Sequence, residues 1–501
     1  MRSGQEYLES LKDGRVVFLN GEQIDDVSEH VAYRNAARSI ARMYDALSDP
    51  ETEETLTTTS EYGDQTHRFF KTPKSAQDLI ASRDAIAEWA KLSYGFMGRT
   101  PDYKASFTAH LDAYSNYYKG FESSAKAWYK KATKEIPFIN HTIINPQVDR
   151  SKPLHENKDV YVRAVKERDD GIVVRGAKMV GTQAALTDYN FVSNYGPMDL
   201  GDGDRSHALI FFMPMNAEGV KMISRTSYEK LATTQGSPYD YPLSSRFDEN
   251  DAVIVLDDVF IPFENVLAYQ NVDVTNRFFT ETGFFNRFTF HGCTRLAVKL
   301  DFMAGLLIKA TEAAGTKQFR GVQANIGEVL ALRNMFWGLS TAMATEPESG
   351  MNGVAIPNGH YANAYRVFAP ISWVRVKNIF EQVVAGGLIQ LPSSANDFLN
   401  PEIRPYLDQY YRGTGIDAVE RVKLMKMIWD AIGSEFGGRH ELYEVNYAGN
   451  HENIRLETLK HAEGKGTAQI MKDFVDSALN DYDLHGWVNP TWKHTSKEMS
   501  L

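Results

Sequence analysis

The chain has 501 residues, of which 43% are hydrophobic, 24% charged and 12% aromatic, a composition typical of soluble globular proteins. Its 54 basic and 65 acidic residues give a formal net charge of −11, without a long basic block. This charge balance argues against nucleic acid or an anionic membrane as a partner, because both attract positive charge.

The single cysteine, Cys293, excludes further classes of protein. One thiol can form neither an internal disulfide nor a CxxC redox pair, and it cannot complete a structural zinc site or an all-cysteine iron–sulfur cluster. A thiolate-ligated haem needs only one cysteine, but Cys293 lies in a helical pattern without a haem-loop signature. We therefore expect Cys293 to be a small core residue, and we expect no metal site.

The sequence shows no sign of a membrane span or a leader. A membrane-spanning helix would need about 18 consecutive apolar residues, and no such run is present. Residues 1–9 are polar and acidic, unlike a signal peptide. We therefore expect a cytoplasmic protein without a membrane partner.

Residues 1–144 are predicted to form a mostly helical domain. Between residues 75 and 93, Leu79, Ile86 and Ala90 recur at spacings of seven and four, the pattern of one buried helix face. A second helix, rich in aromatic residues, is expected over 105–131. The break at 98–103 contains glycine and a proline, and the proline suits the first turn of the next helix.

Residues 145–275 are predicted to form a β domain with long loops. The pattern of 160–174 is strand, an Asp169-Asp170-Gly171 turn, and strand, which predicts a hairpin. Further strands are expected at 208–214, 253–256 and 258–262.

Residues 276–501 are predicted to form a helical bundle followed by a tail. Apolar residues at helical spacing indicate four long helices, which favour an antiparallel four-helix bundle. They are centred on residues 296–307, 326–339, 367–384 and 419–432. The predicted fold class is therefore α+β, with helical, β and helical parts in that order.

Several common catalytic motifs are missing. The sequence contains no GxGxxG after a strand, no GxxxxGK[ST] loop and no GxSxG elbow. No two histidines lie four apart, and the bundle has no Glu-x-x-His pattern, which disfavours a di-iron oxygenase. If the chain is an enzyme, its reactivity is expected to come from an organic cofactor bound without these motifs.

Three polar stretches are candidates for a site, although each also has a simpler interpretation. Arg99 and Tyr103 can converge on a small anion or hydroxyl, or they can cap a surface helix. Residues 141–150 place a histidine, amides and an arginine in one loop, where sites are frequent, but a lone histidine is often a core residue. The glycine pair before Arg439 allows close approach of a ligand, or ends a helix.

Three motifs resemble one known family, the oxygenase components of 4-hydroxyphenylacetate 3-monooxygenase. They are GRTPDY at 98–103, PYDYPLSSRFDEND at 238–251, and the stretch 429–443. The resemblance runs in order from about residue 6 to about residue 487, and it is stronger to the long enteric-bacterial type than to the shorter thermophile type.

The resemblance implies a two-component flavin monooxygenase. A separate NADH-dependent reductase would supply diffusible reduced FAD, which would react with molecular oxygen to a C4a-hydroperoxyflavin. That species would transfer OH to the carbon ortho to a phenol hydroxyl and give a catechol. The implied fold is acyl-CoA dehydrogenase-like, with a helical N-terminal domain, a β-barrel and a C-terminal four-helix bundle, assembled as a homotetramer.

The resemblance also assigns site residues. Arg99, Tyr103 and His141 would contact the phenol oxygen, with Ser193 and Asn194 also lining the substrate site. The residues implied to contact the flavin are His141, Gln147, Val148, Asp149, Arg150, Thr182, Gly449, Asn450, His451 and Glu452, with Arg439 as a further candidate. The stretch 449–452 is expected to reach a flavin in a neighbouring subunit.

Two places depart from the enteric pattern. Where that pattern has glutamine before Ala-Cys, this chain has His291, which is either a second base near the phenol or a packed helix residue. The loop 195–204 is rich in glycine and aspartate and is expected to be a lid over the substrate.

Because such loops vary with substrate, the identity of the phenol is open. 4-Hydroxyphenylacetate is the first expectation, and the alternatives are a halophenol, a nitrophenol or a tyrosine-derived biosynthetic phenol. A more distant alternative is an acyl-CoA dehydrogenase-like flavoenzyme that does not use oxygen.

Overall fold

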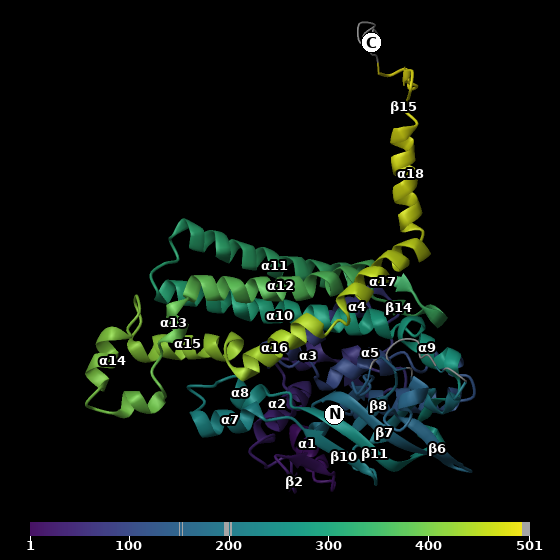
Figure 1. The fold of residues 1–501 in the computed structure, drawn as a ribbon, viewed down its shortest axis with the longest axis horizontal. Coiled ribbons are helices and arrows are strands. Elements are labelled where there is room, and N and C mark those ends of the chain that lie inside the picture. Colours follow the sequence, from purple (N-terminus) through teal and green to yellow (C-terminus); the bar gives the residue numbers. More distant parts are fainter. Residues whose placement is uncertain (150, 153, 195–199, 201–202, 493–501) are drawn as a thin grey trace.

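The computed structural model describes residues 1–149, 151–152, 154–194, 200 and 203–492. Long helices form one layer, sheets with shorter helices form another, and an arm extends from the body at the C-terminal end (Figure 1). Among the described residues, no helix is long and apolar enough to cross a membrane.

The N-terminal region is largely helical, as predicted, and its longest helix is α4 (Ala76–Lys91). Ser75 caps α4, because its hydroxyl accepts a hydrogen bond from the Asp78 backbone N–H at 3.2 Å. Leu79 and Ile86 of α4 are buried in the core, as their spacing predicts. The other helices before residue 100 are α1 (Gly4–Ser10), α2 (Arg34–Asp45) and α3 (Glu53–Leu56).

The single helix expected over 105–131 is wrong in its extent. The chain instead forms α5 (Ala105–Thr108), a series of turns, and α6 (Glu122–Glu135). Gly120, just before α6, has φ +87°, a left-handed conformation that glycine adopts without strain and that interrupts the helix. The aromatic side chains of this segment pack as a cluster, with Phe107 against Phe191 at 4.3 Å between centroids.

The predicted hairpin is confirmed. β6 (Arg163–Arg168) and β7 (Gly171–Thr182) are antiparallel, with Arg168 paired to Gly171 across the turn. β9 (Leu209–Pro214) matches another expected strand, and the two runs at 253–262 form one strand, β11 (Asp251–Pro262). The remaining strands up to residue 270 are β1 (Val17–Leu19), β2 (Glu22–Ile24), β3 (Thr57–Thr59), β4 (Gln65–His67), β5 (Ile139–Thr142), β8 (Tyr189–Val192), β10 (Val220–Ser224) and β12 (Val266–Tyr269).

These strands form two main sheets rather than a closed barrel. One has the order β2-β1-β10-β11-β7-β6 and the other β12-β9-β8-β5. An isolated bridge between Ile144 and Met179 connects the chain after β5 to β7. Both sheets keep unpaired edge strands, so the barrel implied by the resemblance is not found in the part of the chain that the structure describes.

The N-terminal region contributes to the larger sheet, because β1 pairs in parallel with β10. β structure is therefore not confined to residues 145–275, and the domain boundaries at 144 and 275 stay predictions.

The helical C-terminal half is confirmed. α10 (Phe284–Ala313), α11 (Arg320–Thr345) and α12 (Gly359–Val384) lie side by side, and α4 packs against α10 and α11 (Figure 1). α15 (Ala418–Ile432), the fourth expected helix, packs against α10 and against α16 (Glu435–Asn446). Cys293 is buried in α10, as predicted. The shorter elements of the body are α7 (Tyr228–Gln235), α8 (Ser244–Phe247), α9 (Val272–Glu281), β13 (Glu348–Ser349), β14 (Ala355–Ile356), α13 (Gly386–Ile389) and α14 (Arg404–Tyr410).

The C-terminal arm, residues 451–492, contains α17 (His451–Gly464), α18 (Thr467–Leu479), β15 (Tyr482–Asp483) and β16 (Gly486–Trp487). α18 points away from the body (Figure 1), and none of its residues is buried within the described chain. Ile470 and Phe474 of α18 are 69% and 79% exposed. Such large exposed apolar side chains are typical of an interaction surface.

Candidate functional site

Three predicted phenol-site residues meet at the ring of Tyr103. Tyr103 lies on the short 3₁₀ helix η3 (Pro101–Lys104), which begins with proline as the sequence predicts. The imidazole of His141, on β5, stacks on the Tyr103 ring with centroids 5.4 Å apart. The Arg99 guanidinium carbon is 4.2 Å from the centroid of the same ring. Tyr103 and His141 are buried and Arg99 is half-buried.

The Arg99 guanidinium lies among three tyrosine rings. Besides Tyr103, the Tyr447 centroid is 4.9 Å and the Tyr443 centroid 5.5 Å from its carbon. Arg99 Nη1 donates a hydrogen bond to the Tyr443 hydroxyl at 2.8 Å. Among the described residues, Nε and Nη2 have no hydrogen-bond acceptor, so these donors are available to an anion or a hydroxyl.

His141 is a neutral imidazole in this environment. Burial, together with the nearby charges of Lys104 and Arg99, holds the pKa of His141 well below its ordinary value. Its Nδ1 has no hydrogen-bond partner among the described residues, and neither has the Ser193 hydroxyl. His141 pairs with Phe191, and strand side chains alternate, so Ser193 continues the same sheet face just beyond the end of β8.

His291 contacts Tyr103 from α10, with the two rings edge to face and 5.2 Å apart. Its Nε2 lies 3.2 Å from Asp102 Oδ1, and both side chains are almost fully buried. Burial alone would raise the pKa of Asp102, but His291 beside it brings this pKa below its ordinary value. The structure thus brings all four predicted catalytic residues together, and it engages His291 with a carboxylate.

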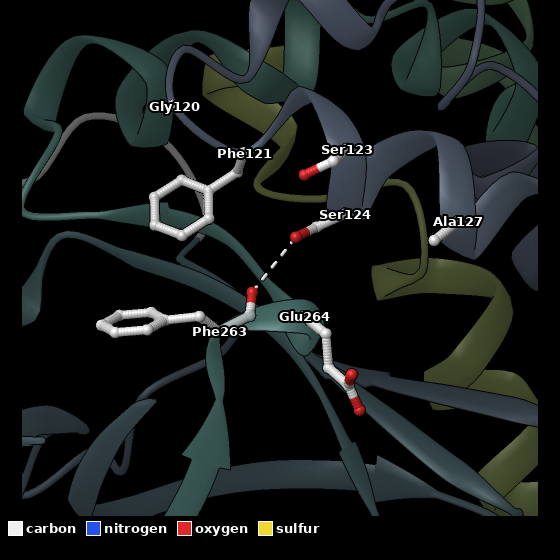
Figure 2. Close-up of a pocket in the computed structure, with 7 residues that line it drawn as sticks. All are labelled: Gly120, Phe121, Ser123, Ser124, Ala127, Phe263 and Glu264. Atoms are coloured by element: carbon white, nitrogen blue, oxygen red, sulfur yellow. Dashed lines mark hydrogen bonds between the residues drawn. The ribbon is translucent and has the colours of Figure 1, made fainter. Parts of the chain in front are cut away.

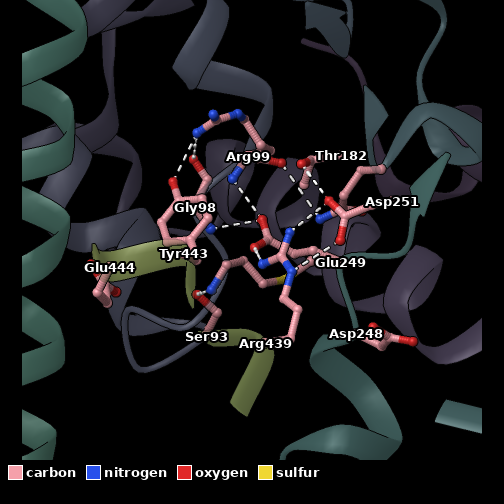
Figure 3. A network of polar contacts seen from close by, with 12 residues as sticks. Ser93, Gly98, Arg99, Thr182, Asp248, Glu249, Asp251, Arg439, Tyr443 and Glu444 are labelled. Atoms are coloured by element: carbon pink, nitrogen blue, oxygen red, sulfur yellow. Dashed lines mark hydrogen bonds and ion pairs between the residues drawn. The ribbon is translucent and has the colours of Figure 1, made fainter. Parts of the chain in front are cut away.

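A polar network connects the Arg99 loop with Thr182 (Figure 3). Glu249 Oε1 accepts hydrogen bonds from the backbone N–H groups of Gly98 and Arg99, at 2.7 and 2.6 Å. Glu249 Oε2 accepts from Arg439 Nη1 at 2.9 Å, and Arg439 also donates to both oxygens of Asp251. The Thr182 hydroxyl donates to Asp251 Oδ1 at 2.6 Å.

Register explains one part of this network, because Thr182 and Asp251 are cross-strand partners of β7 and β11. All three donor nitrogens of the Arg439 guanidinium are engaged by the two carboxylates. These hydrogen bonds hold α16 against the start of β11.

The backbone around Thr182 is strained. Val180 and Gln183 have φ of +59° and +62°, a region that residues with a side chain rarely occupy. Val180 is 54% exposed, and the buried Oε1 of Gln183 has no hydrogen-bond partner among the described residues. Strain of this kind concentrates at functional sites, and the unpaired amide oxygen is a ready acceptor for a ligand.

Lys178, which the sequence analysis does not single out, connects two predicted parts of the site. Its buried Nζ donates to Asn145 Oδ1 at 2.7 Å and to Asn194 Oδ1 at 2.8 Å. Burial lowers the pKa of Lys178 to about 7. Lys178 thus ties the start of the expected flavin loop to Asn194 of the expected substrate site.

The remaining predicted flavin residues lie on the surface of the chain. Gln147 and Val148 are exposed, while Asp149 accepts hydrogen bonds from the backbone and hydroxyl of Ser151. Asn450 caps α17, Gly449 precedes it in the turn after α16, and His451 and Glu452 are the first two residues of α17. None of these residues makes a hydrogen bond or ion pair with Arg99, Tyr103 or His141 in the described chain. Arg150 and most of the expected lid, 195–199 and 201–202, lie outside the described residues.

A cavity of about 620 Å³ lies elsewhere, between the start of α6 and the segment before β12 (Figure 2). Across it, the Ser124 hydroxyl donates a hydrogen bond to the Phe263 carbonyl at 3.1 Å. None of the predicted site residues lines it; its lining consists of Gly120, Phe121, Ser123, Ser124, Ala127, Phe263 and Glu264. Its lining has two phenyl rings, one carboxylate and two hydroxyls, but it has no cationic side chain such as the arginine beside Tyr103.

The sequence analysis also does not single out Asp102, Glu249, Tyr443 or Tyr447 as site residues. Tyr443 and Tyr447 lie four apart, which is the spacing of one helix face, and their rings stack at 4.9 Å. Asp102 and Glu249 lie inside the quoted motifs, but the contacts of Asp102 with His291 and of Glu249 with Arg99 and Arg439 join residues distant in sequence, so no local pattern marks them.

Comparisons with known proteins show the family to which the chain belongs. The family model "4-hydroxyphenylacetate 3-hydroxylase N terminal" matches residues 3–268, and the corresponding C-terminal model matches residues 275–476. The chain is 51% identical over 491 residues to the oxygenase component of 4-nitrophenol 2-monooxygenase from Rhodococcus sp. It is equally similar to the oxygenase component of 4-hydroxyphenylacetate 3-monooxygenase from Klebsiella oxytoca. Each match covers 97% of this chain and 94% of the relative.

Solved structures are similar as well. The crystal structure of an oxygenase component of 4-hydroxyphenylacetate 3-monooxygenase, complexed with FAD and 4-hydroxyphenylacetate, has a TM-score of 0.88 and 30% identity. The match covers 96% of this chain and 99% of that one. An archaeal 4-hydroxybutyryl-CoA dehydratase shares the fold, with a TM-score of 0.83 at 20% identity over 94% of this chain and 95% of that chain.

Fold and relatives together define the class of protein, the oxygenase component of a monooxygenase. Within that class, the chain belongs to the 4-hydroxyphenylacetate 3-hydroxylase family.

Proposed function

We propose that this chain hydroxylates a 4-substituted phenol ortho to its hydroxyl group and gives a catechol, with reduced FAD and molecular oxygen as co-substrates. The observation that carries the proposal is the cluster in which Arg99 and His141 offer free polar atoms beside Tyr103. 4-Hydroxyphenylacetate is the first substrate we expect. A nitrophenol or halophenol is the alternative, because a nitrophenol enzyme is an equally similar relative.

The residues of the cluster suit this chemistry. Transfer of an electrophilic oxygen is faster to an electron-rich ring, and a phenolate is richer in electrons than a phenol. The free N–H donors of Arg99 would stabilise negative charge on the phenol oxygen. A neutral His141 keeps one ring nitrogen as an acceptor, so it would share or accept the phenol proton.

The surroundings of Thr182 fit a flavin. The strained backbone at Val180 and Gln183 and the unpaired Gln183 Oε1 are features that a bound ring system with polar edges would use. Reduced FAD, when bound, supplies the oxygen atom after reaction with molecular oxygen. The residues proposed to hold it are Thr182, His141, Gln147, Val148, Asp149, Arg150, Gly449, Asn450, His451 and Glu452. Arg439 is proposed to support the site through its two carboxylates rather than to bind the flavin.

The proposal includes partners. The absence of a nicotinamide fingerprint and the relatives' description as oxygenase components support a separate reductase that supplies reduced FAD. We place the reaction in the cytoplasm, where NADH is available to such a reductase. The exposed apolar side chains of the C-terminal arm support a homo-oligomer, and the resemblance favours a tetramer.

The direct test supplies reduced FAD, oxygen and a panel of phenols to the purified chain, followed by identification of the products by mass spectrometry. The panel contains 4-hydroxyphenylacetate, 4-nitrophenol, 4-chlorophenol and tyrosine. We expect a catechol from 4-hydroxyphenylacetate. Consumption of reduced FAD without a hydroxylated product from any of the four would contradict the proposal, and a catechol from 4-nitrophenol alone would establish the alternative substrate.

A further inference from the structure

The orientation of the Arg99 guanidinium depends on a residue of α16. A long arginine side chain has many rotamers, so a donor aimed at a phenol oxygen must be held in place. The Arg99 backbone is fixed by Glu249, which accepts from the N–H groups of residues 98 and 99. In the described structure, the Tyr443 hydroxyl is the one side-chain acceptor of its guanidinium, at 2.8 Å from Nη1.

The Tyr443 ring lies directly against the Arg99 loop. A Cβ atom built at Gly98 would lie 2.1 Å from the Tyr443 hydroxyl oxygen, closer than any real contact. The glycine at this position therefore allows the tyrosine to approach the loop. Figure 3 shows Tyr443 beside Gly98, with Arg439 of the same helix bonded to Glu249.

Tyr443 is itself held rigidly. The next residue, Glu444, is fully buried and accepts two hydrogen bonds of 2.6 Å from Arg295 and one of 2.9 Å from Lys299. One turn earlier, Arg439 is fixed by its carboxylates. The Tyr443 hydroxyl is therefore a fixed acceptor on a fixed helix.

We propose that Tyr443 is a positioning residue for phenol hydroxylation: its hydroxyl fixes Nη1 of Arg99, so that Nε and Nη2 are the donors presented to the phenol oxygen. This inference rests on the function proposed above. Through Tyr443, α16 would favour the ionised form of the bound phenol.

The test compares Tyr443→Phe with Tyr447→Phe. Both variants keep an aromatic ring beside Arg99, but the Tyr447 hydroxyl donates to the Phe288 carbonyl rather than contacting Arg99. The readout is the pH titration of bound 4-nitrophenol, whose absorption reports the ionised form without any turnover. Because hydrogen bonds to charged groups are the stronger ones, we expect Tyr443→Phe to weaken binding roughly tenfold and to raise the pKa of the bound phenol by about one unit. Tyr447→Phe should change both values less.

Gly98→Ala is a second variant, because its methyl group would displace the Tyr443 hydroxyl and should shift the titration in the same direction. Thermal unfolding checks that each variant is folded. A folded Tyr443→Phe protein with the parent's binding constant and phenol pKa would overturn the inference, as would an equal effect of Tyr447→Phe. Failure of the parent to hydroxylate any phenol would instead refute the proposed function, and the titration would still report on Tyr443.

Discussion

The sequence leaves two roles open for His291, a base near the phenol and a packed helix residue, and the structure favours the second. Its Nε2 faces Asp102 at 3.2 Å, both side chains are buried, and its ring supports the edge of Tyr103. A residue in this arrangement orients the Tyr103 ring and lowers the pKa of the Asp102 carboxyl. We therefore expect it to affect the phenol only through them.

Replacing His291 with glutamine should therefore destabilise the protein more than it affects hydroxylation. Loss of the imidazole leaves Asp102 buried with a weaker hydrogen bond, at a cost of roughly 1–3 kcal/mol in the free energy of unfolding. Urea unfolding measures this cost, and single-turnover hydroxylation measures the activity. Asp102→Asn is the control, and the double variant should cost less than the sum of the two single changes. Lost hydroxylation at unchanged stability would show that His291 is the base.

At this scale the sequence predicts the types of residue better than their partners. The structure brings together the four predicted catalytic residues, Arg99, Tyr103, His141 and His291. A sequence motif identifies such residues because it records both the side chain and the local backbone that positions it. Lys178 could not be found in this way, since its two acceptors come from separate loops and only the folded sheet brings them to one point.

Among the elements, α16 connects most parts of the site. It carries Arg439 to the Thr182 side, Tyr443 to Arg99, and Glu444 to the bundle. Burial would raise the pKa of Glu444, but Arg295 and Lys299 lower it to about 2.

Glu444→Gln should therefore be strongly destabilising and should change the pH dependence. At neutral pH it leaves two buried cations without a counter-charge, which costs about 3–5 kcal/mol. The folded pKa of Glu444 lies below its ordinary value of 4.5, so its contribution is complete above that value and is lost as pH falls towards 2. The variant should lack this part of the acid decline in the free energy of unfolding. Glu441→Gln, which removes a more exposed ion pair with Lys377, should cost less than about 1 kcal/mol. Equal losses in the two variants would contradict the prediction.

The elements themselves follow the sequence where the pattern is regular. The spacing in α4, the hairpin turn and the long C-terminal helices are local signals, and the structure confirms them. The prediction of one helix over 105–131 is wrong because the apolar residues of this segment pack in an aromatic cluster between α5 and α6. They do not form the buried face of a single helix. The parallel pairing of β1 with β10 is a long-range contact that no local pattern predicts.

For the whole molecule, the C-terminal arm is notable because several of its large apolar side chains have no contact within the described chain that would bury them. Ile470 and Phe474 lie four apart on one face of α18, Trp487 follows further along the arm, and all three are exposed. Burying one large apolar side chain contributes about 1.5–3 kcal/mol, so a second copy of the chain covering this face would be stabilised by several such contributions.

Placing charges on this face should therefore dissociate the assembly. In the double variant Ile470→Asp/Phe474→Asp, two carboxylates would have to be buried at the proposed interface, which is unfavourable without partners. Light scattering at fixed concentration should show a lower mass than for the parent, while Lys472→Ala, an exposed polar position on the same helix, should keep the parent's mass. The stretch 449–452 lies at the start of the arm and is proposed to contact a neighbour's flavin, so dissociation should also weaken the binding of reduced FAD. An unchanged mass would show that α18 is not the interface. A lower mass with unchanged FAD affinity would show that each flavin site is completed within one chain.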